Sequence, residues 1–278
     1  MKKVFLALAV MLSLHFTGAS AQTFRVATYN IRYDNKSDTL NAWHKRLPVM
    51  TDLIKFHDFD IFGSQEGLHH QLEALAIGLE DYAYIGVGRD DGKQAGEFSA
   101  IFYKKDKFRL LQKGNFWLSP VTDRPNKGWD AALPRICSWG QFQDIASGFK
   151  FYLFNVHFDH QGVQARKESA KLVLHQIKKI AGDTPVVLTG DFNLDQTDEG
   201  YAVLSKSNLV QDAYNLSPVR YAPNGTFNGF NINIKSDKRI DHIFLTPHFK
   251  TKRYGILTDS YQGQLPSDHF PVAIEVAY

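Results

Sequence analysis

The sequence predicts an α/β fold in which two β-sheets pack together and helices lie on their outer faces. Short runs of β-branched and aromatic residues recur along most of the 278 residues, and Gly, Pro, Asp or Asn bounds most of them. Only a few segments between these runs show the periodicity of a helix. The sequence has no internal repeat, low-complexity tract or shift in composition, so we expect one large domain. Many strands with few interspersed helices favour two packed sheets.

The expected elements follow from these runs in chain order. The strands are Phe24–Tyr29, Ile61–Gln65, Tyr82–Val87, Ser99–Tyr103, Phe108–Trp117, Ser138–Asp144, Phe149–His157, Val186–Thr189, Ile240–Leu245 and Val272–Val276. The helices are Lys45–His57, Leu68–Leu79, Ala165–Ile180 and Tyr201–Lys206. The third helix carries an apolar stripe that includes Val173 and Ile177, which predicts packing against a sheet. Its lysines lie mostly off that stripe and indicate a solvated face rather than a nucleic-acid-binding patch.

The first 21 residues have the features of a cleavable signal peptide. A basic start, Lys2-Lys3, precedes an apolar run that is too short to span a bilayer, and Ala19-Ser20-Ala21 supplies the small residues of a cleavage site. A buried N-terminal helix is the alternative. We therefore expect residues 1–21 to be removed and residues 22–278 to be exported, either to the periplasm or to the medium. After residue 21 no hydrophobic stretch approaches 18 residues, which predicts no transmembrane segment.

Composition and charge narrow the possible functions. The chain is 44% hydrophobic, which excludes a disordered protein. Without Lys2 and Lys3, its 32 Lys and Arg side chains fall to 30, against 29 Asp and Glu, so a strongly basic nucleic-acid-binding protein is not expected. Cys137 is the only cysteine and can form no internal disulfide, so a hydrophobic core must hold the fold together.

Polar side chains stand at the ends of several predicted strands. These clusters are Asn30, Gln65-Glu66, His157 with Asp159 and His160, Asp191-Phe192-Asn193, Asp241-His242 and Ser267-Asp268-His269. Carboxylates beside hydrophobic strands are costly to desolvate unless they meet a cation or hydrogen-bond donors. Gathered at one edge of a sheet sandwich, they would form a negative pocket whose oxygen ligands suit Mg²⁺, Mn²⁺ or Ca²⁺ better than zinc.

Each polar cluster also has an ordinary structural explanation. Asp191-Phe192-Asn193 is a plausible turn, Asn30 a cap, and Glu66 a residue favoured in the first turn of a helix. His157 alone would more often be a core histidine, and Asp268-His269 can occupy a loop before a proline. The combination favours a functional site, because each cluster interrupts an otherwise strong strand pattern.

The order of these motifs resembles that of the endonuclease/exonuclease/phosphatase superfamily. The matching segments are Thr28-Tyr29-Asn30-Ile31-Arg32, Gln65-Glu66, Asn155-Val156-His157, Gly190-Asp191-Phe192-Asn193, Ile240-Asp241-His242-Ile243 and Ser267-Asp268-His269-Phe270-Pro271-Val272. The resemblance runs from Phe24 to Val276. It implies a four-layer α/β sandwich, with two mixed sheets face to face and helices outside, and it makes residues 22–278 a catalytic domain.

The resemblance also implies roles for individual residues. Glu66 would be the principal metal ligand, helped by Asn30 and by Asp268, with Mg²⁺ as the expected ion and Mn²⁺ or Ca²⁺ as alternatives. Asp191 would position and deprotonate the attacking water, and Asn193 would orient the water or the phosphate. His269 would contact the phosphate or transfer a proton, Asp241 would hold its imidazole, and His157 would donate to a phosphate oxygen or assist the leaving group.

Two arginines are weaker candidates for binding the substrate. Arg135 lies immediately before a predicted strand and Arg166 at the start of a predicted helix, so either side chain could steady a phosphate. A structural salt bridge is an equally good explanation for both. The segment His157-Phe158-Asp159-His160 could hint at a second cation, although a loop turn is the more frequent role of such a segment. Phe227 lies in a loop that could form the rim of the pocket, where its ring could stack on a substrate.

The sequence therefore predicts an exported, divalent-metal-dependent phosphohydrolase that uses in-line attack of water on phosphorus. A phosphodiesterase is the first expectation, with nucleic acid, a phospholipid head group or a sugar or inositol phosphate as the substrate class. Two alternatives remain, a phosphomonoesterase of sugar or inositol phosphates and a catalytically inactive binding or adhesion module on the same fold. The sequence indicates no obligate protein partner.

Overall fold

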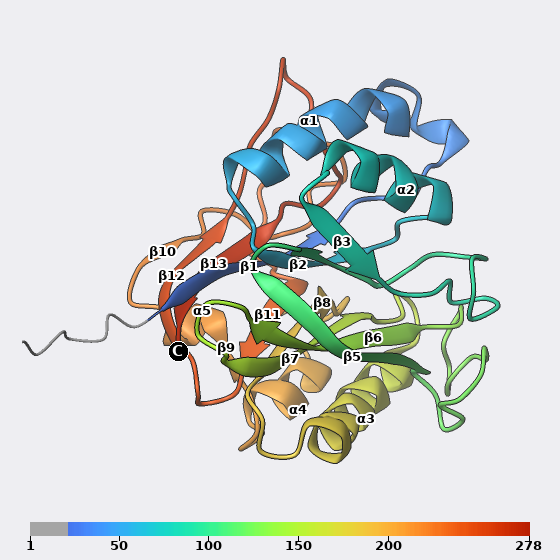
Figure 1. Ribbon diagram of the computed structural model, residues 1–278. Helices are drawn as coiled ribbons and strands as arrows, with labels where there is room; N and C mark the ends of the chain where they lie inside the picture. Colours follow the sequence, from blue (N-terminus) through green and yellow to red (C-terminus); the bar gives the residue numbers. More distant parts are fainter. Residues whose placement is uncertain (1–21) are drawn as a thin grey trace, which may run out of the picture.

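The computed structural model describes residues 22–278 as two β-sheets packed face to face between helices (Figure 1). The predicted signal peptide, residues 1–21, lies outside the described residues. Both sheets are mixed, with most neighbouring strands antiparallel. This arrangement confirms the predicted α/β sandwich. Within residues 22–278 no helix is both long and apolar enough to cross a membrane.

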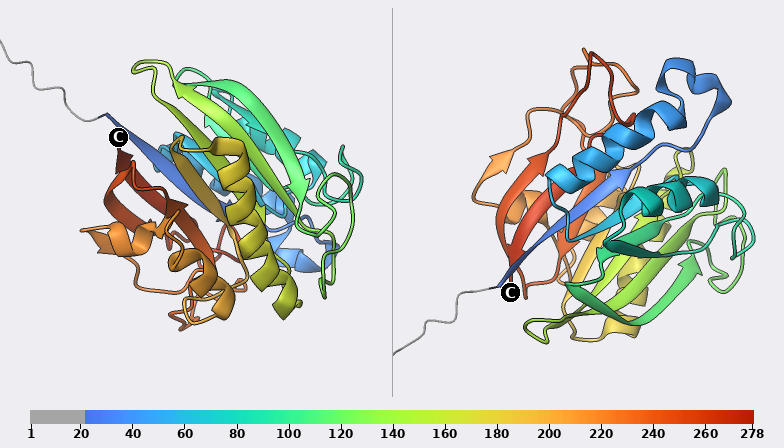
Figure 2. Two further views of the ribbon diagram at one scale, coloured as in Figure 1. Left: turned by 90° about the horizontal axis from the view of Figure 1, so that it is seen from below. Right: turned by 45° about the horizontal axis from the view of Figure 1, so that its top comes forward.

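The first sheet has seven strands. In spatial order they are β10 (Arg220–Tyr221), β12 (Lys250–Ile256), β13 (Val272–Ala277), β1 (Thr23–Asn30), β2 (Ile61–Gln65), β4 (Ala100–Lys104) and β3 (Tyr82–Ile85). Strands β1 and β2 are parallel, so both run toward the same edge of the sheet. Helices α1 (Trp43–Phe56) and α2 (His69–Gly78) cover the outer face of this sheet (Figures 1 and 2). A short 3₁₀ helix, η1 (Lys36–Asn41), precedes α1.

The second sheet has six strands. In spatial order they are β5 (Phe108–Trp117), β6 (Ile136–Asp144), β7 (Lys150–His157), β8 (Val186–Asp191), β11 (Asp241–Leu245) and β9 (Gln211–Asp212). Strands β7 and β8 are parallel, and β11 is antiparallel to β8. Helices α3 (Val163–Ala181) and α4 (Glu199–Ser205) lie on its outer face, and a short helix, α5 (Ala213–Leu216), follows β9 (Figures 1 and 2).

The hydrophobic core forms separate layers, and strand β7 shows why. Side chains alternate between the two faces of a strand. Phe151 and Leu153 belong to the cluster between the sheets, whereas Phe154 and Val156 belong to the cluster under α3. Both faces of β7 are therefore buried, which explains its almost continuous apolar sequence. Val173 in the apolar stripe of α3 packs in the latter cluster, as its periodicity predicts.

Every predicted strand and helix is present, with ends that differ from the predictions by at most two residues. The clearest omission is β12, a strand whose sequence KTKRYGI has little alternation of apolar and polar residues. Only Thr251, Tyr254 and Ile256 are buried in it, and a register shift between Thr251 and Arg253 interrupts the period of two. The short elements η1, α5, β9 and β10 were also missed, because they span too few residues for periodicity to show.

A buried polar seam joins the two sheets beneath the polar strand ends. The Asn155 amide nitrogen donates to the carbonyl oxygens of Ser64, at 2.8 Å, and Ala100, at 2.9 Å. Its Oδ1 accepts from Gln65 Nε2 at 2.7 Å, so both ends of the amide are satisfied. Glycine is required opposite this amide, because a Cβ at Gly63 would lie 2.2 Å from Asn155 Oδ1. The seam holds the ends of β2 and β7 in a defined relative position.

Candidate active site

The polar strand ends meet in one pocket. Parallel strands β1 and β2 end together, as do β7 and β8, and β11 begins opposite the end of β8. The pocket has a volume of about 490 Å³. Its lining includes most of the predicted site residues, namely Glu66, Arg135, His157, Asp191, Asn193, Asp268 and His269. Asn30 and Asp241 are fully buried directly behind this lining.

A carboxylate–imidazole–carboxylate arrangement forms the back of the pocket. Asp241 Oδ2 lies 2.9 Å from His269 Nδ1, so the two residues that the sequence predicts to form a pair are in hydrogen-bonding contact. The other ring nitrogen, Nε2, lies 3.8 Å from Asp191 Oδ2. Burial lowers the pKa of His269, but the flanking Asp241 and Asp191 carboxylates raise it more, to well above its usual value. Burial and the neighbouring Asp241 also raise the pKa of Asp191 to about 7.

His157 lies on the other side of Asp191 and has the opposite electrostatic environment. Its Nε2 is 3.5 Å from Asp191 Oδ2, and its Nδ1 is 3.7 Å from Glu97 Oε2. Burial, followed by the nearby charges of Arg135 and Arg89, lowers the pKa of His157 well below its usual value. The two histidines therefore differ in charge near neutral pH, with His269 protonated and His157 neutral. Such a difference is typical of sites that combine a proton donor with neutral hydrogen-bonding groups.

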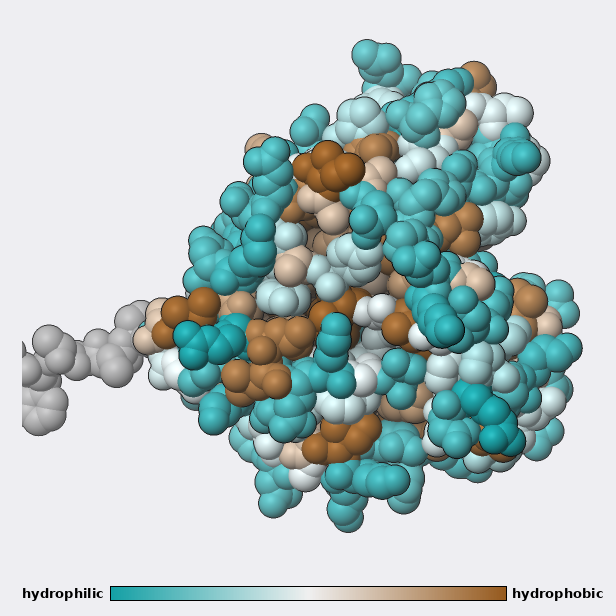
Figure 3. Space-filling view, turned by 45° about the vertical axis from the view of Figure 1, so that its right-hand side comes forward, coloured by the Kyte–Doolittle hydropathy of each residue, from teal (hydrophilic) through white to brown (hydrophobic). Residues whose placement is uncertain are grey.

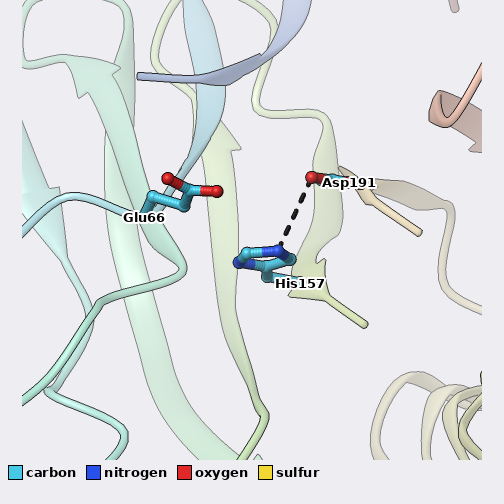
Figure 4. A group of neighbouring side chains, drawn as sticks. All are labelled: Glu66, His157 and Asp191. Atoms are coloured by element: carbon cyan, nitrogen blue, oxygen red, sulfur yellow. Dashed lines mark ion pairs between the residues drawn. The ribbon is translucent and has the colours of Figure 1, made fainter. Parts of the chain in front are cut away.

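Glu66 faces His157 and Asp191 across the pocket (Figure 4). Its Oε1 accepts from Asn30 Nδ2 at 3.0 Å, and its Oε2 accepts from the backbone N–H of Tyr33 at 3.1 Å. The same Asn30 amide donates to Asp191 Oδ2 at 2.9 Å and so connects the two carboxylates. Because Asn30 Oδ1 accepts from the Arg32 N–H at 3.0 Å, the predicted metal ligand Asn30 here orients the two carboxylates through its amide nitrogen.

Three residues of the pocket lining have a backbone conformation that non-glycine residues seldom adopt. Arg32, Glu66 and Asn193 have φ angles of +57°, +67° and +49°, in the left-handed region that is unfavourable for residues other than glycine. All three line the pocket. Asn193 is held there by a bond from its backbone N–H to Asp191 Oδ1, at 2.9 Å, and by one from its Nδ2 to the Phe158 carbonyl, at 3.0 Å. Strain of this kind is retained where it places functional groups.

The donor set fits a divalent cation. Ligand atoms of Glu66, His157 and Asp191 all lie within 4.8 Å of one another. Asp268 adds a further buried carboxylate, whose pKa is raised by burial and by the neighbouring charge of Glu66. A hard cation would relieve this repulsion between carboxylates, and oxygen-rich sites of this kind suit Mg²⁺, Mn²⁺ or Ca²⁺. Asp191, Asp241 and His269 form a second group of possible ligand atoms. In this group, however, His269 Nδ1 and Asp241 Oδ2 already form a hydrogen bond with each other.

Arg46 links the loop that follows Asn30 to the loop that precedes Asp268. This fully buried guanidinium donates to the carbonyl oxygens of Ile31 (2.8 Å), Arg32 (3.1 Å), Asn41 (2.6 Å) and Pro266 (3.0 Å). Ile31 directly follows Asn30 in the chain, and Pro266 lies two residues before Asp268. One side chain of α1 therefore connects two loops that are more than 200 residues apart in sequence.

Replacement of Arg46 by methionine is expected to weaken binding of Mg²⁺ about tenfold, because supporting groups around metal ligands typically contribute that much. The loss of four charged hydrogen bonds should also lower the free energy of unfolding by about 2–4 kcal/mol. Calorimetric titration with Mg²⁺ and thermal unfolding would measure the two effects. Lys55→Met, an exposed change on the same helix, is the matched control. Unchanged Mg²⁺ affinity in a folded Arg46→Met variant would show that Arg46 does not support the proposed metal ligands.

The two arginines that were weaker candidates for binding the substrate, Arg135 and Arg166, lie in different places relative to the pocket. Arg135 lines the pocket, donates from Nε to Asp159 Oδ2 at 3.3 Å and places Nη2 2.9 Å from His160 Nδ1. Arg166 donates to the Asp159 carbonyl oxygen at 3.2 Å and, within residues 22–278, is not part of the pocket lining. Asp159 accepts bonds from several backbone N–H groups, including that of Gly162 at 2.8 Å, so its segment is a loop turn rather than a cation site.

The sequence did not single out several residues of the pocket. Glu97 lies in the connection between β3 and β4, and burial raises its pKa to about 7 although Arg89 opposes this shift. Arg32 and Tyr33 follow β1, where the Arg32 guanidinium lies 3.6 Å from Asp268 and 4.5 Å from the centre of the Tyr33 ring. Phe227, which the sequence analysis did name, lines the pocket, is 44% exposed and packs edge-on against His269. An acidic side chain in a glycine-rich loop was the only sequence signal for Glu97.

Comparison with known proteins agrees with this geometry. The sequence profile of the Endonuclease/Exonuclease/phosphatase family matches residues 27–269. A crystal structure of an endonuclease/exonuclease/phosphatase family protein from Bacteroides thetaiotaomicron is 49% identical, with a TM-score of 0.91, and the match covers 93% of this chain and 99% of that one. A mannosyl-6-phosphatase from the same organism is 50% identical, with a TM-score of 0.90, over 92% of this chain and 100% of that one. An uncharacterized protein of Acanthamoeba polyphaga mimivirus is 26% identical over 251 residues, which are 84% of this chain and 91% of that protein.

Proposed function

This chain belongs to the endonuclease/exonuclease/phosphatase family of metal-dependent phosphoester hydrolases, and we propose that it is a phosphomonoesterase that acts on sugar phosphates. The observation that carries this proposal is the pocket, whose volume of about 490 Å³ is typical of a site for one small ligand. The relative that is 50% identical over its whole length is a mannosyl-6-phosphatase, which supports a hexose 6-phosphate as the substrate. We therefore propose the alternative from the sequence analysis, a phosphomonoesterase of sugar phosphates, in place of the first expectation, a phosphodiesterase.

The charge distribution supports a small substrate with one phosphate. Of the three basic residues that could bind the additional phosphates of an inositol polyphosphate, Lys235, Lys238 and Arg239, two pair with carboxylates instead: Lys238 with Asp195 at 2.9 Å and Arg239 with Asp212 at 3.1 Å. The face shown in Figure 3 is mostly hydrophilic, with hydrophobic residues in small separate groups. It does not have the continuous apolar surface by which an enzyme would engage a lipid bilayer.

The proposed reaction is direct attack of water on phosphorus. The water lies beside Asp191, which accepts one of its protons as the oxygen attacks. The bond from phosphorus to the sugar oxygen breaks, and its electron pair leaves with that oxygen, which takes up a proton from solvent water to give the free sugar and inorganic phosphate. Asp191 then releases the proton that it accepted to solvent. His269, protonated and held by Asp241, donates to a non-bridging phosphate oxygen, while His157 and Asn193 orient the phosphate.

We further propose Mg²⁺ as the cation, held by Glu66, whose carboxylate the Asn30 amide orients, and by the buried carboxylate of Asp268. When bound, such an ion would neutralise charge on the phosphate oxygens. Asp191, Asp241 and His269, which an inactive binding module need not retain, are all present and brought together. This supports the enzyme over the adhesion alternative. Export remains our proposal, on the signal-peptide features of residues 1–21.

A substrate panel tests this proposal. Residues 22–278 would be assayed with Mg²⁺ on mannose 6-phosphate, bis(4-nitrophenyl) phosphate, single-stranded DNA, sphingomyelin and inositol trisphosphate, with release of phosphate or of the leaving group as the readout. We expect kcat/KM to be at least about tenfold higher for mannose 6-phosphate than for any other substrate in the panel. A higher value for either diester or for DNA would restore the phosphodiesterase. No hydrolysis of any substrate would favour the binding module.

A further inference from the structure

One wall of the pocket places a carboxylate beside a guanidinium that has an unused donor. Arg89 holds the Glu97 carboxylate from both sides, with Nη1 at 2.5 Å from Oε2 and Nη2 at 2.8 Å from Oε1. Arg135 Nη1 lies 4.0 Å from Glu97 Oε2 and, among residues 22–278, has no hydrogen-bond partner, although the side chain is only 4% exposed. A buried donor without a partner is costly, so a ligand group is expected to satisfy it.

This wall lies next to the reacting groups but is distinct from them. The His157 ring separates the two, with Nε2 facing Asp191 and Nδ1 facing Glu97. A phosphate bound between Asp191, His157 and His269 would therefore leave this wall within reach of the alcohol half of the ester. Glu97 and Arg135 both line the pocket, whose volume has room for that group.

The charges of the wall are balanced. Arg89 is paired with Glu97, and Arg135 is paired with Asp159 at 3.3 Å. No cation of the wall is therefore left over to neutralise a second anionic group of the substrate. Among the described residues, Arg89 Nε and Arg135 Nη1 are buried donors without a partner, and of these two side chains only Arg135 lines the pocket. The Glu97 carboxylate, which also lines the pocket, can still accept a further hydrogen bond.

We propose that Glu97 and Arg135 form the subsite for the alcohol half of the substrate and select neutral sugars by reading two neighbouring hydroxyl groups. One hydroxyl donates to Glu97, and the next accepts from Arg135 Nη1, a combination that two hydroxyls on adjacent carbons can provide. An alcohol without hydroxyls would leave both protein groups unpaired, and an alcohol with a second phosphate would face the Glu97 carboxylate. The inference rests on the proposed phosphomonoesterase function and adds the residues that set its substrate class.

The test compares two esters of primary alcohols, mannose 6-phosphate and hexyl phosphate, at pH 8, where Glu97 is ionised. The leaving groups are similar, but hexyl phosphate has no hydroxyl. Glu97→Gln keeps the shape of the side chain and loses its charge, and Glu80→Gln, an exposed change, is the matched control. We expect Glu97→Gln to lower the ratio of kcat/KM for mannose 6-phosphate to that for hexyl phosphate about tenfold, mainly through KM, and to raise the relative rate on mannose 1,6-bisphosphate. The control should leave this ratio unchanged.

The outcomes are distinguishable. An unchanged ratio of kcat/KM values in a folded Glu97→Gln variant would overturn the subsite. An equal fall in kcat/KM for both esters, together with weaker Mg²⁺ binding by calorimetry, would also overturn it, because Glu97 would then support the metal rather than the alcohol half of the substrate. If the variant fails to fold, the wild-type protein provides the test. Equal kcat/KM values for mannose 6-phosphate and hexyl phosphate would mean that the protein does not bind the sugar hydroxyls, which would overturn the subsite. Hydrolysis of hexyl phosphate would still support the phosphomonoesterase in that case. Hydrolysis of neither ester would overturn both proposals.

Discussion

Replacement of Asp191 by asparagine is expected to lower kcat by about three to four orders of magnitude while leaving the protein folded. The Asp191 carboxylate lies near both histidines, with Oδ2 3.5 Å from His157 Nε2 and 3.8 Å from His269 Nε2. An amide cannot accept the proton of the attacking water, and a general base contributes roughly 10²–10⁴-fold to rate. Steady-state kinetics with saturating Mg²⁺ would measure the loss.

The same variant should be at least as stable as the wild type. Burial and Asp241 raise the pKa of Asp191 to about 7, above its value in the unfolded chain, so the folded state binds this proton more tightly. The wild type in the absence of metal therefore loses stability as the pH rises from about 4 to about 7, and asparagine removes that loss. Thermal unfolding at pH 7.5 should show an equal or higher midpoint. The control is Asp183→Asn, an exposed change in the loop before β8. Activity within tenfold of the wild type would remove Asp191 from the mechanism.

Removal of divalent cations is expected to abolish hydrolysis, with a loss of at least about a thousandfold, and Mg²⁺ or Mn²⁺ should restore it. The physical reason is the crowding of Glu66, Asp191 and Asp268 in one pocket, where burial raises the pKa of both Asp191 and Asp268. The measurement is phosphate release after dialysis against a chelator, followed by titration of each metal.

Binding of the cation can be followed without activity. A ligand at a hundred times its dissociation constant stabilises the folded state by about 2.7 kcal/mol, so Mg²⁺ should raise the midpoint of thermal unfolding by several degrees. Glu66→Gln should weaken this effect and raise the dissociation constant at least about tenfold, since it removes the charge of the principal proposed ligand. Full hydrolysis in excess chelator, or a Glu66→Gln variant with unchanged Mg²⁺ affinity, would contradict the assignment.

Regular elements and the types of site residue could be predicted because they depend on local patterns. A strand such as β8 shows itself by a short apolar run, and Asp191 is visible because it ends that run with a polar group. The same holds for His157 at the end of β7 and Asp241 at the start of β11. Strand β12 could not be predicted in this way, because its bulge and its exposed lysines remove the alternation on which the prediction depends.

Other contributions to the site depend on contacts between distant segments. Glu97 acquires its position from Arg89 and from His157, which is 60 residues further along the chain, and its place in a glycine-rich loop does not by itself indicate a site residue. Arg46 looks like an ordinary basic residue of an amphipathic helix, yet it is fully buried and binds the carbonyl oxygen of Pro266. The protonation of His157 and His269 also follows from burial and neighbouring charges rather than from residue type.

The sequence alone determined the two-sheet architecture, the family resemblance and the carboxylates and imidazoles at the strand ends, since each strand and its polar end are local features. The tertiary structure decided which of these groups interact. The antiparallel register of β8 and β11 places Asp241 opposite Asp191, and the loop before β13 then brings His269 against both. The volume of the pocket and the wall formed by Glu97 and Arg135 were also visible only in three dimensions. Hydrogen bonding and desolvation act through space, so pairing and protonation emerge only when the strand ends meet.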